Sequence, residues 1–254
     1  MPSHKWLTGS AQSKGRRDIQ ADAYAVSRND AVGRIAAAVT DGIGDTEEAA
    51  TIARLAAAAA AKATLAHDPG QGCQAARARR ATHYASIQQG QYVQQHNVAR
   101  AAEPADASIV TAMLAADHSR LWISWAGLCR AYVLYESGVL ERATFDHRAA
   151  TPIHEATRRG RHPAPYGPEV TRTVGRNEFV TAHLPVRHVT RLLLCSDGVH
   201  RHLAEHAIAT VLRDSSTDAT EAANILARAG GLTGADNATA VVIQRADHQQ
   251  QGRS

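Results

Sequence analysis

Short strand-like segments in two groups, separated by a long helix-forming stretch, constrain the fold of this chain more than any other feature. The strand-like segments are residues 24–26, 35–40, 108–114, 121–126, 131–135, 139–143, 179–184, 192–196 and 238–243. Tight connections such as Ser137-Gly138 join neighbours in the second group, and links this short connect antiparallel strands rather than parallel ones. We therefore expect antiparallel sheets.

Helix signals fill the gap between the two groups. Residues 49–65 are nearly all strong helix formers, Asp45 can serve as the N-cap, and Glu48 stands at the capping-box position. The proline-glycine pair at 69–70 should end this helix, and a second helix should cover about 74–99. Two later helices are expected at residues 205–212 and 218–229. Strands in two groups with helices between and after them predict an α+β layered fold.

Length and composition indicate one globular domain. The chain has 254 residues, 44% hydrophobic and 20% charged, so we expect a single domain over 1–246 and a disordered tail over 247–254. No apolar run approaches the roughly 20 residues needed to cross a bilayer, and residues 1–15 lack the apolar middle of a signal peptide. Three cysteines far apart predict reduced thiols. A cytoplasmic monomer without a membrane partner is expected.

Basic residues are scattered rather than arranged in a stripe. The formal net charge is +4, but no aromatic-interleaved basic surface appears, so a nucleic-acid partner is not expected. The densest cluster, around Arg158, lies in the polar segment 151–175, which we expect to be a surface flap. His202 and His206 are one helical turn apart but lack the glutamate of an H-E-x-x-H zinc motif, so zinc is disfavoured.

Three aspartates stand at the ends of apolar segments. Asp41 follows one strand-like segment, Asp197 follows another, and Asp236 precedes the last one. A strand end holds a carboxylate rigidly while the loop beyond leaves room for substrate. Carboxylates and backbone carbonyls are hard donors that select Mg²⁺ or Mn²⁺, and converging carboxylates need a cation between them. Taken one at a time, each Asp-Gly pair is more typical of a turn or a helix cap than of a metal site.

The acidic residues belong to an ordered set of motifs. These segments are GRRDIQADA at 15–23, VTDGIGD at 39–45, AGLCRAY at 126–132, TFDH at 144–147, VTRTVG at 170–175, LLCSDGV at 193–199 and GADNAT at 234–239. In this order they resemble the motifs of the type 2C (PPM) family of metal-dependent protein serine/threonine phosphatases, bacterial branch. The match spans roughly residues 8 to 244, which is far more specific than any one motif.

The resemblance implies a sandwich of two antiparallel β-sheets flanked by α-helices, with two Mn²⁺ or Mg²⁺ ions between the sheets. By position, Asp41 would bridge the ions, Asp197 and Asp236 would bind one of them, and Gly42 and Asp22 would serve the other. Arg17 would hold the phosphate of a phosphoprotein, the product of a serine/threonine kinase, while a bridging water attacks phosphorus.

Departures from the family pattern keep a second function open. Leu128 occupies the place of an aspartate that helps to bind a third ion in bacterial members, so a third ion should bind weakly or not at all. Ile43 stands where some animal relatives carry histidine, so no side-chain general acid can be named. The alternative to a phosphatase is a catalytically weak pseudophosphatase that binds phosphoproteins as a regulatory module.

Overall fold

The computed structural model describes residues 5–94, 105–115, 119–148, 170–234 and 236–246. The strands are β1 (Trp6–Ser13), β2 (Asp22–Asn29), β3 (Arg34–Gly42), β4 (Ala107–Leu114), β5 (Arg120–Ala126), β6 (Arg130–Tyr135), β7 (Leu140–Arg142), β8 (Val180–Pro185), β9 (Val189–Cys195) and β10 (Ala238–Arg245). The helices are α1 (Glu47–Ala66), α2 (Pro69–Gln94), α4 (Asp197–His200), α5 (Glu205–Arg213) and α6 (Ala219–Thr233).

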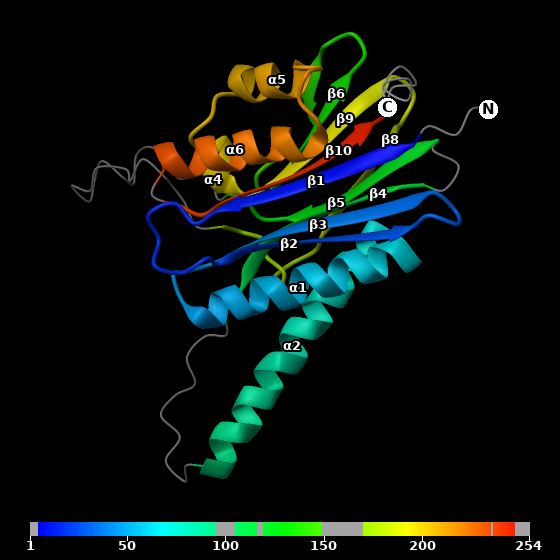
Figure 1. Cartoon of the computed structure of the whole chain (residues 1–254). Helices are drawn as coiled ribbons and strands as arrows, with labels where there is room; N and C mark the ends of the chain where they lie inside the picture. Colours follow the sequence, from blue (N-terminus) through cyan, green and yellow to red (C-terminus); the bar gives the residue numbers. More distant parts are fainter. Residues whose placement is uncertain (1–4, 95–104, 116–118, 149–169, 235, 247–254) are drawn as a thin grey trace, which may run out of the picture.

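The strands form two five-stranded antiparallel sheets. One has the order β1-β10-β9-β6-β7 and the other β2-β3-β4-β5-β8. The helices α5 and α6 cover the outer face of the first sheet, while α1 and α2 lie against the second (Figure 1). The predicted fold class, a sandwich of two antiparallel sheets flanked by helices, is confirmed.

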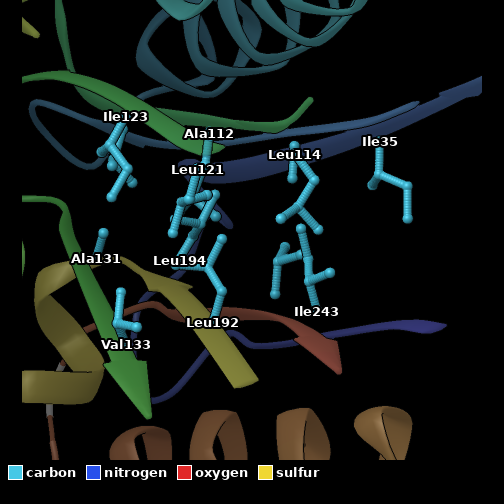
Figure 2. Packing of buried hydrophobic residues seen from close by; sticks show 14 of the residues in the cluster. Ile35, Ala112, Leu114, Leu121, Ile123, Ala131, Val133, Leu192, Leu194 and Ile243 are labelled. Atoms are coloured by element: carbon cyan, nitrogen blue, oxygen red, sulfur yellow. The ribbon is translucent and has the colours of Figure 1, made fainter. Parts of the chain in front are cut away.

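Aliphatic side chains from both sheets fill the space between them (Figure 2). Ile123 and Leu121 point inward from one sheet, and Leu192 and Leu194 point inward from the other. All four are essentially inaccessible to solvent. Burial of each such side chain contributes roughly 1.5–3 kcal/mol, so this layer holds the two sheets together and fixes the distance between their ends.

Alanines form most of the interface between α1 and its sheet. The buried residues of α1 are Ala49, Ala50, Ile52, Ala53, Ala56, Ala57, Ala60, Ala61 and Thr64. Their small side chains let the helix approach the strands closely. By length and hydropathy alone, α1 could cross a membrane, contrary to the expectation that no run of the chain is long enough. Here it packs against β2, β3 and α2, as the core helix of a globular domain does.

Two helix boundaries differ from the prediction. Thr46, not Asp45, is the N-cap of α1, because its side chain accepts a hydrogen bond from the Ala49 amide. Asp45 instead accepts a hydrogen bond from the Ile19 amide, at 3.2 Å. The prediction also started the second helix too late: α2 begins at Pro69, since proline lacks the amide hydrogen that the first turn of a helix leaves unpaired anyway.

Strand β1 was missed by the sequence prediction. It pairs with β10 along its whole length, from Trp6 opposite Arg245 to Ser13 opposite Ala238. Its serine, glycine and glutamine residues have low strand propensity, so only the neighbouring strand determines its conformation. The predicted tail at 247–254 and the end of the second predicted helix, 95–99, lie outside the described residues.

Candidate metal centre

The ends of four strands bring the predicted aspartates to one end of the sandwich. Asp22 begins β2 and lies opposite Asp41 in the β2–β3 register. Asp197 stands two residues after the end of β9, as the first residue of α4, and Asp236 stands two residues before β10, which neighbours β9. Each sheet therefore supplies two carboxylates. Their proximity is evident from mutual electrostatic effects, since Asp197 and Asp236 raise the pKa values of both Asp22 and Asp41.

Asp22 links the two sheets through hydrogen bonds. Its Oδ2 accepts from the Ser196 hydroxyl at 2.6 Å and from the Thr239 hydroxyl at 2.9 Å, and all three residues are buried. Burial raises the pKa of Asp22 to about 7, with smaller contributions from Asp197 and Asp236, although the two hydroxyl donors act in the opposite direction. Without a cation, this carboxyl group therefore keeps its proton to a higher pH than an ordinary aspartate does.

Asp41 lies at the centre of the cluster. Burial raises its pKa well above the usual value, and the charges of Asp197, Asp22 and Asp236 raise it further. Burial also raises the pKa of Asp197, whereas Arg201 and a hydrogen bond with Asp41 lower it. Four carboxylates that oppose one another's ionisation form a site that a divalent cation would relieve.

Two guanidinium groups pair with two of these carboxylates. Arg17 Nη2 lies 3.1 Å from Asp236 Oδ1, and Arg201 Nη2 lies 2.8 Å from Asp197 Oδ2. Arg17, the predicted phosphate-binding residue, thus forms an ion pair at the rim of the cluster in this structure, and its contact with phosphate stays a prediction. Sequence analysis missed Arg201, although its position four residues after Asp197 places both side chains on one face of a helix.

The donor set suits Mg²⁺ or Mn²⁺, because it consists of carboxylates next to exposed loop backbone. Within the described part of the chain, however, no three His, Cys, Asp or Glu side chains converge as ligands of a bound ion would. The hydrogen bonds explain this arrangement: Asp22 turns toward two hydroxyls, while Asp197 and Asp236 turn toward arginines. The residues therefore fit the ions by chemistry and position, and in this structure arginines pair with two of the four carboxylates.

Gly42 is required at its position by close packing. A Cβ atom there would lie 2.7 Å from the Ala21 carbonyl oxygen and 2.8 Å from the Ala49 carbonyl oxygen. Its amide donates to the Ala21 carbonyl at 3.0 Å. The glycine lets β3, the start of β2 and α1 meet beside the aspartates. Its predicted role as a carbonyl ligand stays a prediction.

Asn237 fixes the loop that carries Arg17. Its Oδ1 accepts from the Ala21 amide at 2.8 Å, and its Nδ2 donates to the carbonyl oxygens of Lys14 and Ile19 at 2.8 and 3.0 Å. Its side chain thus satisfies three backbone groups of the segment that leads to Asp22. The sequence motif contained Asn237 next to Asp236, but only the fold reveals this role.

Leu128 lies in a tight turn beside α4. Its carbonyl oxygen is 2.9 Å from Nε2 of His200, and its amide donates to the Ser108 hydroxyl at 3.2 Å. The side chain is 5% exposed and offers no atom that could bind a cation.

Nearby, Arg130 makes two hydrogen bonds to Asp146, at 2.7 and 2.8 Å, and so connects two further motif segments.

The predicted flap falls mostly on residues 149–169, which lie outside the described residues. Its described end is held by Asp106, whose carboxylate accepts from the Thr173 hydroxyl at 2.6 Å and from the Gly175 amide at 2.9 Å. Arg80 of α2 lies 3.3 Å from the same carboxylate. The segment that follows residue 169 is therefore tied to β4 and α2.

Comparisons with known proteins agree with this geometry. No protein-family model matches the chain. In sequence it is similar to the serine/threonine phosphatase stp of Listeria monocytogenes, with 30% identity over 155 residues, and the matched part covers 58% of this chain. That part spans only 59% of the length of the Listeria relative.

Solved structures are similar over nearly the whole chain. The Mycobacterium tuberculosis serine/threonine phosphatase PstP/Ppp is 22% identical, with a TM-score of 0.70 and coverage of 95% of this chain and 99% of that one. The catalytic domain of PstP has also been solved in complex with two manganese ions, with the same TM-score and identity. PppA of Pseudomonas aeruginosa has a TM-score of 0.68 at 23% identity and covers 95% of this chain and 98% of its own. This chain has the fold of the type 2C (PPM) serine/threonine phosphatases and is similar in sequence to one serine/threonine phosphatase, the Listeria stp, over 58% of its length.

Proposed function

We propose that this chain is a metal-dependent protein serine/threonine phosphatase, which hydrolyses phosphoserine and phosphothreonine in proteins. The observation that carries the proposal is the cluster of four aspartates, contributed by both sheets and electrostatically coupled at one end of the sandwich. Burying these carboxyl groups close together costs a large desolvation free energy, which lowers the stability of the fold. Such a cost favours a functional role for the four aspartates. The likeness to named serine/threonine phosphatases supports the same activity.

In this proposal, each residue of the cluster has a distinct role. Asp41, with Asp22 opposite it and Asp197 within hydrogen-bonding reach, would bridge two ions. Asp197 and Asp236 would bind one ion, and Asp22 with the Gly42 carbonyl would serve the other. Two Mn²⁺ or Mg²⁺ ions bound there would supply an activated water and stabilise negative charge on the phosphoryl group.

Arg17 would change partners during turnover. It lies beside Asp236 in this structure, so an ion that binds Asp236 would release the guanidinium group. Its planar fork can then hold two phosphate oxygens, a geometry that lysine does not offer. Arg17 would thereby orient the phosphoryl group, and the Asn237 hydrogen bonds would hold the loop that carries it.

The test is hydrolysis of p-nitrophenyl phosphate and of a phosphothreonine peptide, with and without Mn²⁺, by the native chain and by Asp41→Asn and Asp236→Asn. The proposal expects Mn²⁺-dependent turnover that both substitutions abolish. Leu128 favours a second candidate, the pseudophosphatase that only binds phosphoproteins. Phosphopeptide binding by the native chain without turnover at any Mn²⁺ concentration would establish that candidate and overturn the first.

We further propose that the chain acts in the cytoplasm, as a single domain and a monomer, on proteins phosphorylated by a serine/threonine kinase. Three buried, unpaired cysteines among the described residues support a reducing compartment. Light scattering after gel filtration checks the monomer, and limited proteolysis checks the division into a domain over 1–246 and a tail.

A further inference from the structure

Arg201 is held rigidly beside the metal centre. Its Nη2 lies 2.8 Å from Asp197 Oδ2, with 21% of the Arg201 side chain and 7% of the Asp197 side chain exposed. The Arg201 amide also donates to the Asp197 carbonyl oxygen at 2.9 Å. Next to Asp197, a Cβ atom on Gly198 would lie 1.9 Å from the Asn237 carbonyl oxygen. The short helix α4 is thus pressed against the start of β10, and Arg201 has little freedom to leave Asp197.

The other guanidinium at the cluster is placed differently. Arg17 lies on a loop before β2, and the side chains of Arg17 and its partner Asp236 are 36% and 26% exposed. Water screens an ion pair of this kind, whereas a buried carboxylate that loses its paired cation becomes strongly unfavourable. The Asp197–Arg201 pair is the more buried of the two, and the positive charge of Arg201 acts on both Asp197 and Asp41.

We propose that Arg201 is a built-in counter-cation of the metal centre, which neutralises Asp197 in the metal-free protein and lowers the affinity of the site for divalent ions. The inference rests on the proposed metal-dependent function and adds a positioning residue to it. A metal ion at Asp197 must either take the oxygen that Arg201 contacts or sit beside a positive charge a few ångströms away. Both arrangements weaken ion binding, because like charges repel strongly where little water screens them.

Removing the charge should therefore have opposite effects on folding and on metal binding. Arg201→Gln should lower the melting temperature in chelator, since Asp197 then lies among the other carboxylates without the cation that pairs with it. The same variant should bind Mn²⁺ about tenfold more tightly, because the competing charge is gone. Arg201→Lys keeps the charge and should stay close to the native chain in both measurements.

The experiment is calorimetric titration of each variant with Mn²⁺ in the absence of substrate, together with thermal melting in chelator. Arg142→Gln is the matched control, because Arg142 pairs with Glu205 on an exposed surface and should leave both readouts unchanged. Should Arg201→Gln fail to fold in chelator, Arg201→Met, which keeps the packing of the aliphatic stem, takes its place.

Two outcomes separate this inference from the proposed function. In the first outcome, the native protein binds Mn²⁺ but the dissociation constant of the charge-removing variant is unchanged or higher. This result overturns the role of Arg201 and leaves the phosphatase proposal standing. Absence of Mn²⁺ binding by the native chain and by every variant defeats the metal centre itself. A tighter-binding Arg201→Gln with a native-like Arg201→Lys is the expected result.

Discussion

At the scale of single residues, Asp22 makes the metal-free protein sensitive to pH. Its pKa is about 7 in the folded state and near 3.9 in an unfolded chain. The folded state therefore binds a proton more tightly, so stability is lost as pH rises from about 4 to about 7. Between pH 5 and pH 8 in chelator, the free energy of unfolding of the native chain should fall by roughly 2–3 kcal/mol from this group.

The Asp22→Asn variant tests this prediction. Asparagine keeps an oxygen that can accept from the Ser196 and Thr239 hydroxyls but has no charge to bury. Urea denaturation at pH 5 and pH 8 should show a smaller pH-dependent loss for the variant than for the native chain. Equal losses in the two proteins would mean that Asp22 is ionised at both pH values.

Asp146 should have the opposite pH dependence. Burial raises its pKa, but the two hydrogen bonds and the charge of Arg130 outweigh burial, so the pKa lies below its usual value. The ion pair of Arg130 and Asp146 stabilises the fold above about pH 4, and its contribution to the free energy of unfolding is lost as pH falls further. At pH 7, Asp146→Asn should lower the free energy of unfolding by about 1.5–3 kcal/mol.

The exposed pair of Arg28 and Asp30 is the matched control for Asp146. The Asp30 side chain is 83% exposed, and such pairs contribute little. Asp30→Asn should change stability by no more than about 0.5 kcal/mol. Chemical denaturation at pH 7 and at pH 3 measures both variants, and a similar effect of the two substitutions would contradict the role of burial.

At the scale of elements, Asn237 connects the start of β10 to the loop before β2. Asn237→Ala removes three hydrogen bonds and leaves the Ala21 amide without its partner, so it should cost about 2–4 kcal/mol of stability. Because the loop carries Arg17, phosphopeptide turnover should fall more steeply than Mn²⁺ affinity. Asn29→Ala, at the exposed end of β2, is the control, and thermal melting with steady-state kinetics provides the readouts.

At the scale of the whole molecule, the metal centre should act as a clamp between the two sheets. Asp22 and Asp41 belong to one sheet, and Asp197 and Asp236 adjoin strands of the other. An ion bound by both pairs is lost on unfolding, so Mn²⁺ at a hundred times its dissociation constant should add about 2.7 kcal/mol of stability. Melting curves with Mn²⁺ and with chelator measure this gain. Asp41→Asn should abolish it, and a full gain in that variant would exclude Asp41 as a bridging ligand.

The sequence alone determined the strands that have a strong apolar pattern and the stretches that form helices. It also identified the four aspartates that stand at or near the ends of strands. Local information suffices there, because burial periodicity and strong propensities act within a few residues. The prediction from the sequence failed at β1. This strand contains Gly9, which has a low strand propensity, and it is stabilised by pairing with β10. It also failed at the N-cap of α1, since Asp45 and Thr46 are both good caps and only the contact of Asp45 with Ile19 selects between them.

Only the tertiary structure decided which charges meet. The register of β2 against β3 sets Asp22 opposite Asp41, and the packing of one sheet on the other brings Asp197 to Asp41. Electrostatic energy depends on distance and on burial, and neither can be read from sequence separation. The sequence therefore named the carboxylates, whereas the hydrogen bond between Asn237 and the Ala21 amide emerged only once segments 216 residues apart had packed together.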